Sequence, residues 1–97
     1  MKHPFDYMKI TYSIDNYEVS YIIVAKCIGI SKDVKNDKIS SFKVQIINVI
    51  EDNDTVLDDI QKGNDDSVIY YAFDPRNPPL GYKIDFLTEK DNPEYFI

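Results

Sequence analysis

The feature that most constrains this chain is an alternation of apolar and polar side chains with a period of two residues. It is clearest in the segment MKITYSI, residues 8–14, where Met, Ile, Tyr and Ile alternate with Lys, Thr and Ser. Successive side chains of a β-strand point to opposite faces of the sheet, so this pattern predicts a strand with one buried face. The alternation returns in residues 82–88, YKIDFLT. We therefore expect a sheet protein rather than a helical one.

The residue composition agrees with that expectation. Ile and Val are frequent, there are eight Tyr, and only two alanines occur, Ala25 and Ala72. β-branched and aromatic residues favour strands, whereas a helical protein of this size uses alanine more often. The chain has 97 residues and 43% hydrophobic content, which is enough for one small core. We expect a single globular domain over residues 1–97.

Five strands are expected along the chain, with two irregularities. Gly29 indicates a bulge or bend, and the apolar phase slips at Ile46-Ile47, as it does when a bulge inserts an extra residue. Asp15-Asn16 is a turn dipeptide that predicts a hairpin. The expected strands are Met8–Ile14, Tyr17–Ile30, Ile39–Ile50, Ser67–Asp74 and Tyr82–Thr88.

One short helix is expected between the third and fourth strands. Asp52, Asn53 or Asp54 can cap its first turn, and Gly63 can end it. Val56, Leu57 and Ile60 would form its narrow apolar stripe. The resulting order is β-β-β-α-β-β. This is the order of a five-stranded antiparallel OB-like barrel, and a curled sheet with a helix packed on it is the alternative.

The charge of the chain is concentrated in one segment. The net charge is −6, and residues 51–66, EDNDTVLDDIQKGNDD, hold seven carboxylates and one lysine. Some of these acids have a capping role in the expected helix. The acids that we assign to a partner-binding patch are Asp54, Asp58, Asp59, Asp65 and Asp66.

The same segment does not fit the spacing of a calcium loop. An EF-hand needs oxygen ligands at positions 1, 3 and 5, and a glycine at position 6. Counting from Asp52 puts Val56 at position 5, and counting from Asp54 puts it at position 3. We therefore expect no metal site and no cofactor.

Catalytic chemistry is not indicated either. The only histidine is His3, and the only cysteine, Cys27, lies in an apolar strand where a cysteine is usually a small buried hydrophobe. Adjacent carboxylates such as Asp58-Asp59 point away from each other on a helix. The sequence thus predicts a non-enzymatic protein.

The residues also suggest where the protein resides. A lone cysteine excludes an internal disulfide, and the apolar runs are shorter than the roughly 20 residues of a membrane helix. The first residues, MKHPFDYMK, have no apolar core of the kind that a signal peptide needs. We expect a cytoplasmic protein.

Three roles remain: binding of a protein partner, binding of single-stranded nucleic acid, and a structural role in a larger assembly. The first is association with a basic protein partner, with Tyr70, Tyr71, Arg76 and Tyr82 as possible anchors. In size and acidity the chain resembles bacterial immunity proteins and phage-encoded inhibitors of host defence, whose carboxylates occupy a site meant for phosphates. That resemblance implies inhibition of a nucleic-acid-handling protein. The structural role would be that of a subunit in a larger assembly.

The alternative is an OB-like module that binds single-stranded nucleic acid. Such modules track the phosphate backbone with basic residues and stack bases on aromatic side chains. The hairpin between the second and third expected strands carries the basic residues for this function, which are Lys26, Lys32, Lys35, Lys38 and Lys43.

Overall fold

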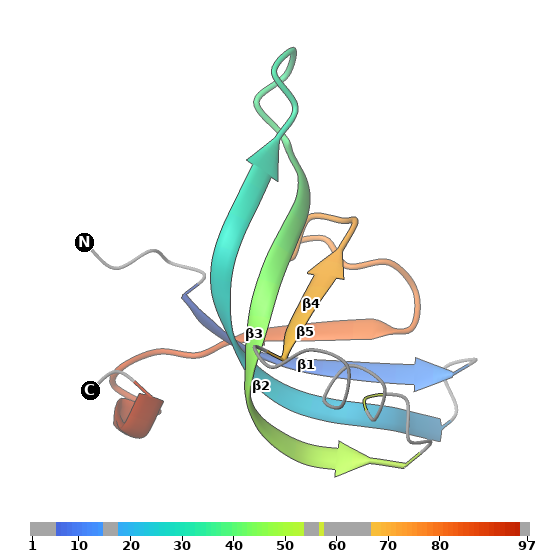
Figure 1. Cartoon of the computed structure of the whole chain (residues 1–97), viewed down its shortest axis with the longest axis vertical. Coiled ribbons are helices and arrows are strands. Elements are labelled where there is room, and N and C mark those ends of the chain that lie inside the picture. Colours follow the sequence, from blue (N-terminus) through green and yellow to red (C-terminus); the bar gives the residue numbers. More distant parts are fainter. Residues whose placement is uncertain (1–5, 15–17, 54–56, 58–66, 96–97) are drawn as a thin grey trace.

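The chain forms one five-stranded antiparallel sheet (Figure 1). The computed structural model describes residues 6–14, 18–53, 57 and 67–95. The strands are β1 (Tyr7–Ile14), β2 (Glu18–Lys32), β3 (Ile39–Asp52), β4 (Val68–Tyr71) and β5 (Tyr82–Phe86). Their order across the sheet is β4-β3-β2-β1-β5. The expected strands are confirmed, although β4 is shorter than predicted.

Both predicted irregularities are present. Val24 pairs with Asn48 while Ala25 pairs with Ile46, so Ile47 is an extra residue in β3. In β2, Ile28 is the extra residue before Gly29. A bulge bends its strand and increases the local twist. The long β2-β3 ribbon therefore curves instead of lying flat.

The core lies on one face of the sheet, which we call the core face. Alternate residues of neighbouring strands meet there: Ile10 of β1 pairs with Ile23 of β2, and Val44 of β3 pairs with Ile69 of β4. The largest fully buried side chain is that of Phe42. The buried cluster consists of Met8, Ile10, Tyr21, Ile23, Ala25, Phe42, Val44, Leu57 and Tyr71. The opposite side of the sheet is called the outer face.

The sheet does not close into the barrel that the element order suggested. A barrel would require the two edge strands, β4 and β5, to hydrogen-bond to each other, but the strand order leaves them at opposite edges. Their aromatic side chains meet instead, with ring centroids 5.7 Å apart for Tyr71 and Tyr82 and 5.1 Å for Phe73 and Tyr82. The barrel interpretation is wrong. The sheet is open, as in the alternative, and the described residues do not include the helix that the alternative packs on it.

The predicted helix lies mostly outside the described residues. Its proposed first cap, Asp52, is the last residue of β3. Asn53 also remains tied to the sheet, because its backbone N–H donates to the Ser20 carbonyl at 2.8 Å. Leu57 is fully buried in the core. Within the described ranges, the one helical element is a 3₁₀ turn, η1 (Pro93–Tyr95), and no helix is long and apolar enough to cross a membrane.

Candidate binding surfaces

The four predicted anchor residues do not form one surface. Tyr71 is 5% exposed, and its hydroxyl lies 2.8 Å from that of Tyr21 within the core. Tyr82 is half-buried and packs on Tyr12 with ring centroids 4.7 Å apart. Tyr70 is 63% exposed because it points to the outer face. Among the three tyrosines, Tyr70 is the most exposed.

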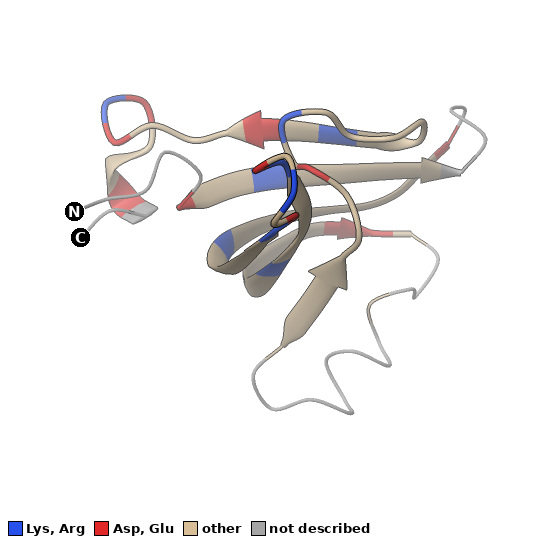
Figure 2. Ribbon diagram, turned by 90° about the horizontal axis from the view of Figure 1, so that it is seen from above, with Lys and Arg blue, Asp and Glu red and all other residues tan. Residues whose placement is uncertain are grey.

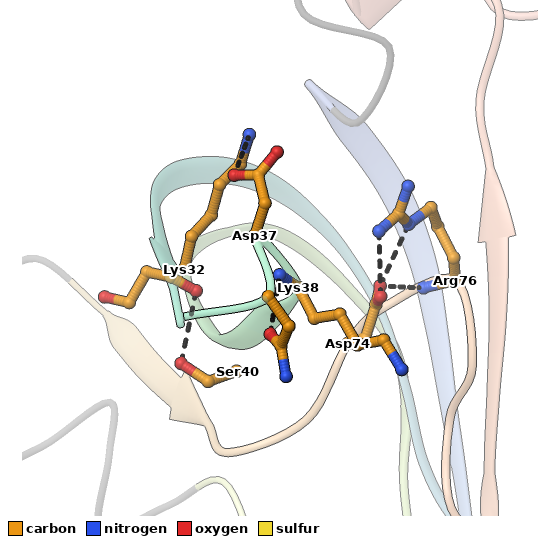
Figure 3. Close-up of polar contacts among 8 residues, drawn as sticks. Lys32, Asp37, Lys38, Ser40, Asp74 and Arg76 are labelled. Atoms are coloured by element: carbon orange, nitrogen blue, oxygen red, sulfur yellow. Dashed lines mark hydrogen bonds and ion pairs between the residues drawn. The ribbon is translucent and has the colours of Figure 1, made fainter. Parts of the chain in front are cut away.

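Arg76 lies in the proline-rich loop after β4, where it is held by Asp74. Its Nη2 lies 2.9 Å from Asp74 Oδ2, and its Nε donates to Oδ1 at 3.1 Å (Figure 3). The hydrogen bonds from the guanidinium lower the pKa of Asp74, and the backbone N–H of Arg76 adds to the effect. This contact stabilises the turn and occupies one edge of the guanidinium.

Two of the predicted lysines share the outer face with Tyr70. Lys43 of β3 pairs with Tyr70 of β4, and Lys26 of β2 pairs with Gln45 of β3. All of these side chains are exposed. The structure thus brings together basic and aromatic residues from three neighbouring strands. Sequence spacing alone did not place Tyr70 in this group.

The other three lysines lie at the turn between β2 and β3. Lys32 forms an ion pair with Asp37, with the lysine Nζ 3.8 Å from Oδ1 (Figure 3). The Asp33 carboxylate accepts a hydrogen bond from the Lys35 backbone N–H at 2.9 Å. Lys35 and Lys38 are exposed. The two aspartates in this loop thus have local partners in the turn.

The predicted acidic patch, Asp54, Asp58, Asp59, Asp65 and Asp66, lies outside the described residues. The structure does describe both ends of the segment that carries it. Glu51 and Asp52 end β3, whose arrowhead is red in Figure 2, and Glu18 begins β2 at the same end of the sheet. Ser67 rejoins the sheet through its carbonyl, which accepts from the Ile46 N–H at 2.9 Å.

Two isoleucines in the last part of β3 are exposed, and the alternation pattern alone does not predict them as surface residues. Ile47 is 44% exposed and Ile50 is 47% exposed. Each is the extra residue of a bulge, because neither has a partner in the register with β2. The phase slip at Ile46-Ile47 predicts a bulge near these residues, but it does not show which side chain is the extra one or that this side chain faces solvent.

Two pockets of the described part of the chain are lined by residues that could bear on chemistry. A pocket of about 270 Å³ is lined by Asp6 and residues 27–30. Burial raises the pKa of the Cys27 thiol, and the nearby Asp6 raises it further, whereas a nucleophilic cysteine needs a lowered pKa. A second, wider pocket of about 400 Å³ lies between the proline loop and β1 and includes Thr11, Ser13 and Lys83. In the described ranges, no group of three His, Cys, Asp or Glu residues could hold a metal ion.

Comparison of the chain with protein-family models, with curated proteins and with solved structures found no match.

Proposed function

We propose that this protein is a non-enzymatic binding module that associates with, and inhibits, a basic protein that handles nucleic acid. The surface that we assign to this function is the acidic end. It consists of Glu18, Glu51 and Asp52 together with the segment that leaves β3 at Asn53. That segment holds most of the seven carboxylates of residues 51–66.

The observation that carries the proposal is the exposure of Ile47 and Ile50 in the last part of β3, which ends in Glu51 and Asp52. Complementary charge speeds association, but apolar groups that become buried supply most of the affinity of an interface. Both isoleucines are the extra residues of bulges in β3, and both are exposed. On such a surface, carboxylates can take the place of phosphates in the basic site of a partner, and the isoleucines add apolar area that becomes buried.

The acidic end is separated along the β2-β3 ribbon from the lysines at the turn between these strands, Lys32, Lys35 and Lys38. β3 begins at Ile39, next to the lysine-containing turn, and ends at Asp52. A basic partner approaching the acidic end therefore meets few lysines, and the net charge of −6 favours its approach. This arrangement is consistent with binding at one end of the molecule.

The test begins with recovery of the partner on the immobilised protein at low salt, followed by measurement of the association rate. Changing Asp54, Asp58, Asp59, Asp65 and Asp66 to Asn should slow association at least about tenfold, because electrostatic steering supplies factors of roughly 10 to 1,000. Ile47→Ser with Ile50→Ser should instead speed dissociation. Inhibition is read from the activity of the recovered partner.

A matched control changes five acids elsewhere, Asp33, Asp37, Asp85, Glu89 and Glu94, to their amides. It alters the net charge equally but leaves the acidic end intact, so its association rate should fall much less. Equal rates for the two variants would remove the acidic end from the interface. A partner that binds without loss of its activity would refute inhibition.

The alternative, binding of single-stranded nucleic acid, is supported by the position of Tyr70 among lysines on the outer face. Tyr70 can stack on a base while Lys43 and Lys26 contact phosphates. The single-strand measurement described in the next subsection tests it.

A further inference from the structure

The β2-β3 ribbon extends beyond the rest of the sheet. β1 pairs with β2 only as far as Lys26, and β4 pairs with β3 only as far as Phe42. Residues 28–41 therefore have no third strand beside them, and Figure 1 shows this hairpin projecting from the sheet. We call residues 28–41 the arm. Its two strands have bulges at Ile28 and Ser40, which increase the twist of the ribbon.

The tip of the arm is built as an ordered turn. The backbone N–H of Asp33 donates to the Lys38 carbonyl at 2.7 Å, and that of Asp37 donates to the Asp33 carbonyl at 2.9 Å. Asp37 adopts a positive φ of 56°, which aspartate tolerates better than most residues. Val34 lies in this turn with 99% of its surface exposed. The turn thus presents one apolar side chain at the most distant part of the arm.

The arm and its base are basic. Residues 26–43 contain five lysines and two aspartates, a net charge of +3. Asp37 pairs with Lys32, and Asp33 is bound by the turn backbone. Within the described structure, the ammonium groups of Lys26, Lys35, Lys38 and Lys43 have no carboxylate partner. These four are free to contact phosphates, and Figure 2 shows the basic positions on the ribbon.

We propose that the arm binds double-stranded nucleic acid by entering a groove of the duplex. A two-stranded β-ribbon fits the major groove of B-form DNA, and lysines along its sides can reach the phosphates of both strands. Val34 at the tip would contact the base edges, as apolar side chains do at thymine methyl groups or at base steps. This function goes beyond the proposed binding of a protein partner, and it uses the opposite end of β3.

The experiment measures fluorescence anisotropy with a labelled duplex of about 20–30 base pairs and with one of its strands alone, from about 50 to 200 mM salt. The duplex should bind more tightly than the single strand. Changing both Lys35 and Lys38 to Ala should weaken binding and reduce the slope of log Kd against log salt by about 2, one for each phosphate contact. Val34→Ser should weaken binding several-fold and leave that slope unchanged.

The control is a variant with Lys83→Ala and Lys90→Ala, two exposed lysines away from the arm. It has the same net charge as the Lys35 and Lys38 variant and should bind nearly as well as the natural protein. If the two double-lysine variants lost equal affinity for the duplex, binding would depend only on net charge, and the proposal would be overturned. Preference for the single strand would also overturn it and would favour the surface around Tyr70. The Asp→Asn variant of the acidic end should bind the partner protein more weakly and still bind the duplex. This result would separate the two functions.

Discussion

At the residue scale, the neighbours Tyr70 and Tyr71 show how one residue type takes opposite roles. Successive side chains of a strand face opposite sides of the sheet, so Tyr70 reaches solvent whereas Tyr71 enters the core. In the core, Tyr71 packs against Phe42 and shares a hydrogen bond with Tyr21. This buried pair of hydroxyls is the polar contact on which the aromatic core depends.

Replacing Tyr71 by Phe should remove the contact between its hydroxyl and that of Tyr21, at a cost of about 0.5–1.5 kcal/mol in the free energy of unfolding. Urea denaturation of Tyr71→Phe, Tyr21→Phe and the double variant measures this. The double variant should lose less than the sum of the single losses, because each single change already removes the same contact. Tyr70→Phe is the control and should change stability little. Strictly additive losses would show that the two hydroxyls do not interact.

The same pair makes stability depend on pH in alkaline solution. Burial raises the pKa of Tyr71 and of Tyr21 well above the ordinary value of about 10. The unfolded chain releases these protons near pH 10 while the folded chain retains them. The contribution of the two tyrosines to the free energy of unfolding is therefore complete below about pH 10 and declines as the pH rises above it. The double Phe variant should lose less stability between pH 9 and about 11 than the natural protein does.

At the element scale, turns and bulges determine where the strands lie. Gly81 precedes β5 with a φ of 98°, and its carbonyl accepts a hydrogen bond from the Ser13 N–H at 2.8 Å. A Cβ at this position would lie 3.2 Å from the Ser13 carbonyl oxygen. Gly29 differs, because a Cβ there would meet only the Lys43 Cβ at 3.9 Å.

We expect Gly81→Ala to destabilise the protein by about 1–3 kcal/mol, since alanine rarely adopts this φ and the added carbon is crowded. Gly29→Ala should change stability by less than about 1 kcal/mol, because ordinary contact distances are kept. Thermal unfolding of the two variants compares them directly. An equal effect at both positions would mean that the backbone near Gly81 adjusts without strain.

At the scale of the whole molecule, the two edges of the sheet approach each other through side chains. Tyr82 of β5 contacts Tyr71 and Phe73, which belong to β4 and the loop after it. Leu57, from the segment between β3 and β4, joins the same buried cluster. The molecule thus has a core without a closed barrel.

Leu57→Ala should cost about 2–5 kcal/mol, the usual loss for a large buried side chain that leaves a cavity. The matched control is Leu80→Ala, because Leu80 is 87% exposed in the proline loop and should change stability by about 0.5 kcal/mol at most. Chemical denaturation provides both values. If Leu57→Ala were as mild as Leu80→Ala, the segment between β3 and β4 would not be anchored through this residue.

By itself, the sequence determined the strands, their order along the chain and two bulge positions, because alternation and its phase slips are local properties. Only the tertiary structure decided that the sheet stays open and that its edges are joined by aromatic rings, since strand pairing depends on contacts between distant residues. The candidate surfaces divide in the same way. The distribution of charged residues along the sequence was enough to single out the lysine-containing hairpin and the acidic segment as candidate surfaces. Exposure of Tyr70, Ile47 and Val34 required the fold, because the same side chain is buried or exposed according to which face it meets.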